Sequence, residues 1–392
     1  MAKKGTKIKR YGSIYERKNG SVILALTMLV GLVIFGIAGW LLYTPVHDFI
    51  MGLGAEEQPS VDVAESSQTV SENVSSTTSP QPEQQETVKA EKDIKAIFLP
   101  VEQLLDENAL DAALKNAAAS GINTVVVDGK DSSGTVLYSS SNGVAKSSGV
   151  AAASVYDAAK ISAAIKKSGL SPAVRLHAFK DAAAPAADRD MAVHYYDTDI
   201  YWLDNSPELG GKMWLNPYSD KTQGYILSLI EELCSAGFET VMLDSVQFPS
   251  GVGLDKAGYG ENAKTVSKSQ LLNGFVKKAT EAAESNGAQL LLCTDDMWLA
   301  PGAENYNAAV YGGSPVQFFT DKIVVSLPDD SSVWKSRAKM IMDNTQSEII
   351  VAAKAFAEDG TPLDSGLLIE QLSSIGSDGF ILYDPLGKYK FN

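Results

Sequence analysis

Residues 92–392 predict an α/β fold, and within that class a (β/α)8 TIM barrel, on three observations. Short apolar runs alternate with amphipathic helical patterns about eight times. The runs are apolar throughout rather than alternating with polar residues, which is typical of parallel strands covered by helices. Their span of about 300 residues suits a barrel, whose usual size is ~250 residues. An open doubly wound sheet is the alternative, which the lack of a glycine-rich phosphate loop after the first strand disfavours.

The barrel prediction rests on eight predicted strands. In chain order they are residues 94–100, 124–128, 173–179, 240–248, 289–295, 322–327, 348–355 and 379–384. Helical patterns lie between them. Leu272, Phe275 and Val276 recur at helical spacing between the fourth and fifth strands, and Gly287 stands where that helix should end.

The N-terminal part predicts a membrane anchor. Residues 21–43 carry no charge, and a helix of that length rises about 34 Å, enough to span a bilayer. Residues 1–20 hold seven Lys or Arg and one Glu, which predicts a basic cytoplasmic tail. We therefore expect a single-pass cell-membrane protein with an extracellular barrel. A cleaved signal peptide is the alternative, but its apolar region is usually shorter.

Residues 44–91 predict a flexible, low-complexity linker. From residue 55 onward they are mostly Ser, Thr, Glu, Gln and Pro, which cannot bury enough apolar surface to offset the entropy of ordering. A disordered interaction motif is the alternative reading of this segment.

Charge and cysteine content exclude several classes of function. The formal net charge is −15 although the first 20 residues are basic, so the remainder is strongly acidic and nucleic acid is not expected as a partner. Cys234 and Cys293 have no metal-like spacing and are expected to be buried free thiols. No His or carboxylate cluster has metal-ligand spacing, so neither a metal nor a cofactor is predicted. The oligomeric state is not predicted.

Polar residues collect at the C-terminal ends of the predicted strands, where (β/α)8 barrels hold their active sites. In chain order they are Asp128, Lys130, Asp131, Arg175, His177, Lys180, Asp244, Gln247, Asp295, Asp296, Lys354, Tyr383 and Asp384. A single Asp there could instead cap the next helix. Lys and Arg do not cap helix N-termini, so the set as a whole favours a pocket. His177 is more readily explained as a core residue.

Asp244 and Asp295 are the predicted catalytic pair. They end neighbouring strands about 4.8 Å apart, and paired carboxyls can act as acid and base, or as nucleophile and acid, on a glycosidic bond. If Asp244 is catalytic, we expect its replacement by Asn to keep or raise stability, because carboxylate repulsion is relieved. No Glu ends a strand, so the acid could also come from a loop. The loop candidates are Glu208, Glu261, Glu304 and Glu358.

The long loop after the third strand is rich in aromatic residues, among them Trp202 and Trp214. Exposed aromatic faces near a polar pocket suit stacking on sugar rings. The alternative is a hydrophobic lid that packs on itself.

Several motifs together resemble a bacterial putative glycosyl hydrolase family of (β/α)8 barrels, distantly related to the α-amylase clan. They are "NTVVVDGKDSSGTVLYSS", "AVRLHAFKD", "MWLNPYSD", "GFETVMLDSVQFP" and "DGFILYDP", within residues 93–385. The resemblance implies that Asp244 takes the nucleophile position and Asp295 the fifth-strand Asp. It also matches Asp128, Lys130, Arg175 and the segment Asn216, Pro217, Tyr218 to family positions.

This sequence departs from the family pattern at several of those positions. Ser245 and Gln247 stand where the family usually has Tyr and Arg, Lys354 replaces a Gln, and Asp384 replaces an Asn. The sixth-strand motif is reduced to "VVSLPDD". These departures imply altered substrate contacts.

The sequence therefore predicts a membrane-anchored extracellular glycoside hydrolase that acts on a polysaccharide or cell-surface glycan, in a Gram-positive bacterium. A catalytically inactive barrel that serves as a glycan-binding or cell-wall module is the alternative, favoured by the missing strand-end Glu. Asp244 would be the nucleophile or electrostatic stabiliser, and Asp295 the acid/base. The predicted substrate-binding residues are Asp128, Lys130, Arg175, Trp202, Trp214, Gln247, Asp296, Lys354, Tyr383 and Asp384.

Overall fold

The structure is a computed structural model that describes residues 93–148 and 151–391. The predicted cytoplasmic tail, transmembrane helix and linker lie outside the described residues. Within the described part of the chain, no helix combines the length and the apolar character needed to cross a membrane.

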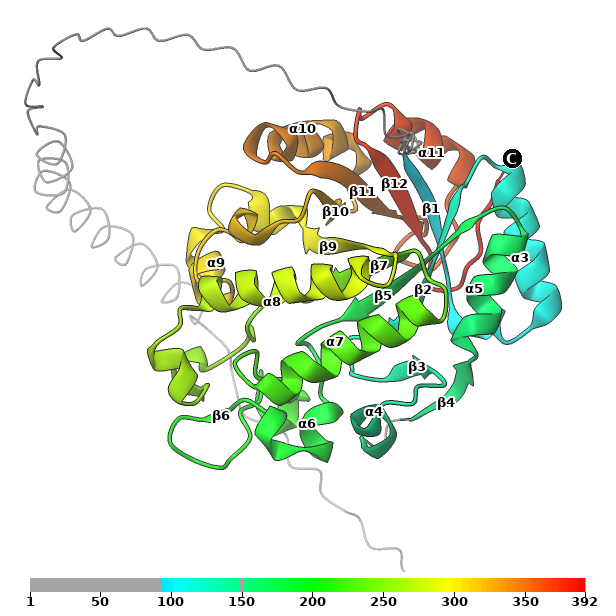
Figure 1. The fold of residues 1–392 in the computed structure, drawn as a ribbon. Helices are drawn as coiled ribbons and strands as arrows, with labels where there is room; N and C mark the ends of the chain where they lie inside the picture. The colour runs from blue at the N-terminus through cyan, green and yellow to red at the C-terminus, as the bar shows by residue number, and fades with distance from the viewer. Residues whose placement is uncertain (1–92, 149–150, 392) are drawn as a thin grey trace, which may run out of the picture. The chain divides into compact units, whose positions relative to one another are not determined.

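Eight parallel strands form a closed barrel, which confirms the predicted barrel architecture (Figure 1). β1 pairs in parallel with both β12 and β2, and this double pairing closes the ring. All eight predicted strands are present, with ends that shift by a few residues. The barrel strands are β1 (Ile94–Leu99), β2 (Thr124–Lys130), β5 (Ser171–His177), β7 (Thr240–Asp244), β9 (Gln289–Asp295), β10 (Lys322–Ser326), β11 (Glu348–Lys354) and β12 (Gly379–Tyr383).

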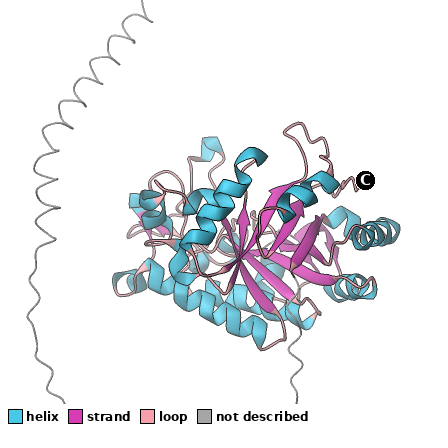
Figure 2. Cartoon of the chain, turned by 90° about the horizontal axis from the view of Figure 1, so that it is seen from above, coloured by secondary structure: helices cyan, strands magenta, loops and turns pink. Residues whose placement is uncertain are grey.

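Helices surround this ring, as the view in Figure 2 shows. They are α2 (Val101–Leu104), α3 (Glu107–Ala119), α5 (Ala158–Lys167), α7 (Asp220–Ser235), α8 (Lys268–Glu284), α9 (Glu304–Val310), α10 (Trp334–Asn344) and α11 (Ser365–Ser373). The longer ones, such as α7 and α8, each bury an apolar stripe. α8 illustrates why: Ser267 and Gln270 form a capping box at its start, and its predicted stripe from Leu272 to Val276 is buried.

Within the described residues no helix follows β12, and a tail takes its place. The Tyr389 hydroxyl lies within hydrogen-bonding distance of two carbonyl oxygens, that of Phe98 at 2.7 Å and that of Leu382 at 3.0 Å, and its one proton can be donated to either. It also accepts from the backbone N–H of Phe98 at 3.1 Å. One phenol thereby contacts backbone groups of both β1 and β12 beside the seam where the barrel closes.

Short insertions that the sequence analysis missed interrupt the strand–helix alternation. Between β2 and α5 lie β3 (Val136–Tyr138), α4 (Gly143–Ser147) and β4 (Ala151–Tyr156). Between β5 and α7 lie α6 (Ala184–Ala187) and β6 (His194–Tyr195), and β6 pairs antiparallel with β8 (Ala257–Gly258). Two- and three-residue strands are too short to show a period in sequence.

Trp202 and Trp214 form the small hydrophobic core of this insertion together with Val193. Trp202 is 0% exposed and Trp214 is 2% exposed. Their indole N–H groups donate to the carbonyl of Gly253 and to the carboxylate of Asp204, both at 3.0 Å. The prediction that the two tryptophans bind substrate is therefore wrong, and the alternative of a self-packed lid describes them.

Lys130 and Asp384 are also structural, which corrects two further predicted ligand contacts. A register shift after Asp128 turns Lys130 away from the barrel mouth. Its side chain is 0% exposed and its Nζ lies 3.0 Å from Oδ2 of Asp181 and 2.5 Å from the carbonyl of His177. Asp384 is 2% exposed, and its carboxylate accepts the backbone N–H groups of the turn that follows β12.

We predict that Lys130→Met lowers the free energy of unfolding by about 3–5 kcal/mol, because it leaves a buried carboxylate without its cation. Adding Asp181→Asn should restore at least about 1 kcal/mol, since the amide oxygen can still accept the N–H groups of Ala183 and Ala184. Urea unfolding followed by circular dichroism measures both.

The matched control is Lys115→Met, which removes an ion pair with Asp111 whose side chains are 73% and 61% exposed. It should change stability by less than about 0.5 kcal/mol. A Lys130→Met variant as stable as this control would contradict the structural role.

Candidate active site

A cavity of about 550 Å³ opens at the C-terminal ends of the barrel strands. Every strand of the ring contributes to it, as (β/α)8 geometry requires. One lining residue from each strand, in chain order, is Phe98, Val126, Arg175, Asp244, Asp295, Ser326, Lys354 and Tyr383. Below it the lumen is filled by apolar side chains such as Ala96, Ala173, Leu291 and Ile350. The polar groups therefore share one mouth above a closed apolar floor.

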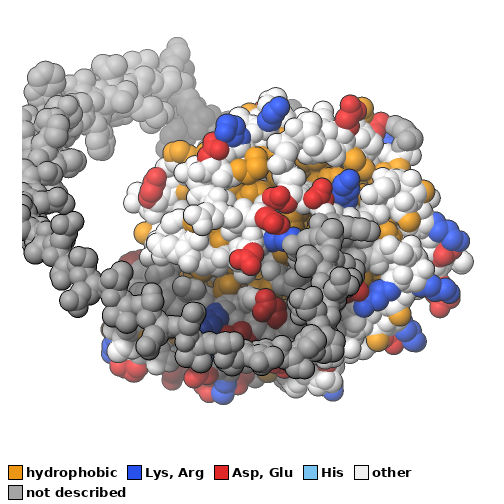
Figure 3. All heavy atoms as spheres, turned by 45° about the horizontal axis from the view of Figure 1, so that its top comes forward, with side chains coloured by type: hydrophobic (Ala, Val, Ile, Leu, Met, Phe, Trp, Pro, Cys, Tyr) orange, Lys and Arg blue, Asp and Glu red, His pale blue; other side chains and the backbone are white. Residues whose placement is uncertain are grey.

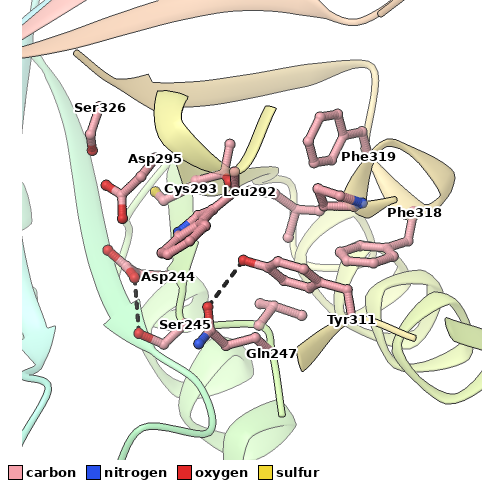
Figure 4. A pocket seen from close by; sticks show the side chains of 14 residues that line it. Asp244, Ser245, Gln247, Leu292, Cys293, Asp295, Tyr311, Phe318, Phe319 and Ser326 are labelled. Carbon is pink, nitrogen blue, oxygen red and sulfur yellow. Dashed lines mark hydrogen bonds between the residues drawn. The ribbon is translucent and has the colours of Figure 1, made fainter. Parts of the chain in front are cut away.

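Asp244 ends β7 at the centre of this mouth, with His177 as its register partner on β5. Nδ1 of His177 lies 3.4 Å from Oδ1 of Asp244 and 3.0 Å from the hydroxyl of Ser245. The Ser245 hydroxyl donates to the same carboxylate oxygen at 2.9 Å, drawn as the dashed line between Asp244 and Ser245 in Figure 4. Ser245 has a left-handed φ of 55°, uncommon for a residue with a side chain. Two groups thus fix one oxygen of Asp244.

The surroundings of Asp244 favour its ionised form. Burial by itself would raise the pKa of this carboxyl. The charge and hydrogen bond of His177, the charge of Arg175 and the hydrogen bond of Ser245 outweigh burial and hold the pKa well below its usual range. The side chain nevertheless remains 31% exposed in the mouth. Asp244 is therefore an accessible carboxylate that stays charged at neutral and acidic pH.

Arg175 is held beside Asp244 by a two-pronged ion pair with Asp128. Nε and Nη2 of Arg175 lie 2.7 and 3.0 Å from the two oxygens of Asp128. The guanidinium also lies over the rings of Phe98, at 5.3 Å, and Tyr383, at 5.2 Å. Burial opposes the charge on Arg175, but Asp128 raises its pKa above the ordinary value. Of the pair, Arg175 lines the cavity, so the structure gives Asp128 a supporting role.

Asp295 lies on the other side of Asp244 and behaves differently. Figure 4 shows the two carboxyls side by side in one pocket. Partial burial raises the pKa of Asp295, and the charge of Asp244 raises it further, although hydrogen bonds with Ser326 and Trp298 act against this. Asp295 therefore keeps its proton to a higher pH than an ordinary Asp. One carboxyl of the pair is held charged and the other is biased toward the protonated form.

A second, small cavity of about 50 Å³ adjoins the first and shares both carboxyls with it. Gln247 lines this cavity rather than the larger one. Its Oε1 accepts the Tyr311 hydroxyl at 3.0 Å, and its Nε2 lies 3.4 Å from the Tyr306 hydroxyl. Gln247 could therefore contact a substrate only through a group that enters the small cavity.

The rim of the large cavity carries paired charges. Asp296 lies 3.5 Å from Arg337, and Lys354 lies 2.8 Å from Asp329. Burial raises the pKa of Asp296 while Arg337 acts to lower it. On the face drawn in Figure 3, acidic and basic side chains likewise lie next to one another, with hydrophobic side chains between them. Asp296, Lys354 and Tyr383 are all at the cavity wall, where the sequence analysis placed them.

Several residues of the site were not predicted. His177 was expected to be a core residue, yet it contacts Asp244. Its position opposite Asp244 in the sheet register was the available signal. Ser326 and Arg337 line the wall but were not singled out, although Ser326 lies within the reduced sixth-strand motif "VVSLPDD", and Cys293, expected to be buried, faces the cavity. The four loop Glu candidates do not line it. Among the described residues, no group of His, Cys, Asp and Glu is arranged to hold a metal.

Comparison with known proteins gives a family and a set of similar folds. Residues 96–292 match the family model described as "Putative glycosyl hydrolase domain". No curated protein matches the chain. Among solved structures, a hypothetical protein from Ruminiclostridium thermocellum is 23% identical with a TM-score of 0.44, covering 50% of this chain and 96% of that one.

Two enzymes of known name are similar at lower identity. The catalytic domain of β-amylase from Paenibacillus polymyxa is 11% identical with a TM-score of 0.47, covering 74% of this chain and 92% of that one. An exo-β-N-acetylglucosaminidase from Vibrio harveyi is 11% identical with a TM-score of 0.46, covering 74% of this chain. The match spans 50% of the Vibrio chain.

The opposite pKa shifts of the two carboxyls predict opposite effects on stability. The lowered pKa of Asp244 means that its charge stabilises the fold above pH ~4 and that this contribution is lost as the pH falls further. Asp244→Asn should therefore cost about 1–3 kcal/mol at pH 7. The raised pKa of Asp295 means that its charge is a burden at neutral pH, so Asp295→Asn should keep or raise stability.

Urea unfolding of both variants at pH 7 and at about pH 2 measures this difference, because the Asp244 contribution is lost only below its unfolded pKa of about 3.9. The loss caused by Asp244→Asn should shrink at the lower pH. The relief of repulsion expected for Asp244 is therefore predicted for Asp295 instead, because the structure places the unfavourable charge there. If Asp295→Asn were the less stable variant at pH 7, the division of charge described here would be contradicted.

Proposed function

We propose, because the chain belongs to the family described as "Putative glycosyl hydrolase domain", that the barrel is a glycoside hydrolase acting on a polysaccharide or cell-surface glycan. The observation that carries the proposal is the pair Asp244 and Asp295, two carboxyls in one cavity whose pKa values are shifted in opposite directions. Glycosidic bond cleavage needs two carboxyls in different protonation states.

Asp295 is the general acid in this proposal, because its raised pKa keeps a proton available. It donates that proton to the glycosidic oxygen, and the bond from this oxygen to the anomeric carbon breaks. Asp244, held ionised, attacks the anomeric carbon or stabilises the positive charge that develops there. A carboxylate with so low a pKa is a poor proton acceptor, which favours these roles over that of a general base.

The second half of the reaction returns the enzyme to its starting state. Water attacks the anomeric carbon and gives a proton to Asp295, which is now the base. If Asp244 had formed an ester, its bond to the sugar breaks at this step and the carboxylate is regenerated. Arg175 and His177 hold the Asp244 charge throughout, and Tyr383 offers an aromatic wall to the sugar.

A catalytically inactive, glycan-binding barrel is the second candidate. It is favoured by the absence of any Glu from the described residues that line the cavity, since a Glu can serve as the acid in glycosidases. The activity measurement below separates the two functions.

We propose that residues 21–43 anchor the protein and that the barrel lies outside the cell, with carbohydrate as its ligand. The support is in the sequence: an uncharged 23-residue stretch directly after seven basic residues. The linker at residues 44–91 would give the barrel reach from the membrane surface.

The topology predicts that protease treatment of intact Gram-positive cells expressing the full chain releases the barrel as a soluble fragment. A cytoplasmic marker protein must survive the same treatment. Complete protection of the barrel, with digestion only after lysis, would contradict the outward orientation.

The assignment of acid and nucleophile predicts a dependence on the leaving group. Asp295→Ala should lose activity by about 100-fold or more on a natural glycan, yet keep most of it on a nitrophenyl glycoside, whose leaving group needs no proton. Asp244→Asn should lose about 1000-fold or more on both. Asp343→Asn, an exposed change on α10, is the control and should behave like the unaltered protein.

Rates of glycan and aryl glycoside cleavage across pH measure these effects. The falling limb of the pH profile reports the pKa of Asp295, lies above the ordinary Asp value, and should disappear in Asp295→Ala. Equal losses on both substrate types in Asp295→Ala would remove its role as acid. If a broad panel of glycans is bound but none is cleaved, the binding function replaces the enzymatic one.

A further inference from the structure

We propose that a groove between α9 and α10 binds additional neutral sugar residues of the same glycan chain that enters the active-site cavity. The groove has a volume of about 690 Å³, within the ~300–1,000 Å³ usual for ligand pockets. The inference rests on the proposed function and extends it, because it makes the substrate a chain rather than a single sugar.

The groove and the active-site cavity have two walls in common. The first is the 3-10 turn η5 (Asp296–Leu299), where Met297 lines the cavity and Trp298 lines the groove. The second is α10, where Arg337 lines the cavity and Met340 lines the groove. A chain that fills the mouth would therefore reach the groove by crossing over η5 and α10.

Trp298 provides an aromatic surface at this boundary. Its ring is stacked on Tyr306, with centroids 3.6 Å apart and an interplanar angle of 6°. The stack holds the indole in one orientation, as a rigid platform for a sugar ring must be held. Trp298 also lines the small cavity next to Asp295, so this platform adjoins the catalytic pair.

The chemistry of the groove suits neutral, hydroxyl-rich ligands. Its lining includes the amides of Asn307, Gln317 and Asn344, and an amide offers both donors and acceptors to hydroxyl groups. Glu304 is the one charged residue among the described residues that line it, and no Lys or Arg is present there. This differs from the rim of the active-site cavity, where charges are paired.

Asn307 carries a polar atom that the protein does not satisfy. It is 7% exposed, and its Nδ2 donates to the carbonyl of Trp298 at 2.8 Å. Its Oδ1 is buried without a hydrogen-bond partner. Buried acceptors without donors are rare and destabilising, and a ligand hydroxyl entering the groove would supply the missing donor.

Two methionines allow the cavity and the groove to be observed separately. Met297 is 54% exposed at the cavity and Met340 lies in the groove. In the full-length chain labelled with ¹³C-methyl methionine, Met297→Leu and Met340→Leu assign the two signals. The probes are cellohexaose, maltohexaose and xylohexaose, three neutral chains. We expect at least one of them to shift both signals with a single saturation curve.

The test variant is Gln317→Ala combined with Asn344→Ala, since both side chains are exposed and their loss should not disturb the fold. It should raise the Kd for the hexasaccharide, measured from the Met340 signal, by about tenfold or more, because two hydrogen-bonding groups are lost. The matched control is Asn305→Ala, which removes an exposed amide from α9 outside the groove. It should leave both curves unchanged.

The other combinations of Met297 and Met340 shifts separate the groove proposal from the proposed function. If Met297 shifts and Met340 does not, the groove proposal is wrong while the proposed function stands. If Met340 alone shifts, the groove is supported and the cavity loses its role as the sugar site. If no hexasaccharide moves either signal, or if the double variant binds as tightly as the control, the groove is not a site for neutral sugars.

Discussion

Closure of the strand ring is the constraint on which the rest of the molecule depends. β1 pairs with β2 on one side and β12 on the other, so each of the eight ring strands has a ring neighbour on both sides. In a closed ring, alternate residues of every strand must point into one narrow lumen. The lower positions are therefore small or apolar, as with Ala96 and Ala173. Polar side chains are confined to the last inward positions, where the lumen opens to solvent.

The unequal character of the two carboxyls follows from their places in this ring. The strand on one side of Asp244 is β5, which supplies the cation of Arg175 and the imidazole of His177. Asp295 lies one strand further from those groups, and Ser326 on β10 offers it only a hydroxyl. Two Asp residues in one cavity thereby acquire pKa values shifted in opposite directions. The opposite pKa shifts of Asp244 and Asp295 therefore depend on which strands are neighbours in the ring as well as on the residue types.

The sequence was sufficient to find the barrel because each strand is a continuous apolar run bounded by turns. It was also sufficient to place Asp244, Asp295 and Arg175 at the mouth. Side chains alternate along a strand, so the inward positions near its C-terminal end follow from the residue numbers. The prediction was wrong for Lys130, because a register shift between Asp128 and Lys130 changes the direction in which the Lys130 side chain points. Local sequence carries little signal for such an irregularity.

The prediction for the aromatic loop, that its tryptophans bind substrate, was wrong for a different reason. Whether Trp202 is exposed depends on a second segment, near Gly253, that follows a different strand and completes a small core around it. A contact between two distant loops has no period and no fixed spacing, so composition alone left a sugar platform and a packed lid as equal alternatives. His177 shows the same limit, because its importance comes from a register partner on another strand.

The mouth of the barrel is asymmetric, and this bears on how a long ligand could lie. The insertions after β5 and β7 fold on themselves through the β6–β8 pair and its tryptophan core. By contrast, η5 and α10 each present side chains to the cavity on one flank and to the groove on the other. A chain that continues beyond the mouth thus meets a closed, self-packed layer in one direction and polar amides beside an aromatic ring in the other. The groove side combines the buried, unpartnered Oδ1 of Asn307 with the aromatic surface of Trp298, and this favours extension of the proposed glycan over η5.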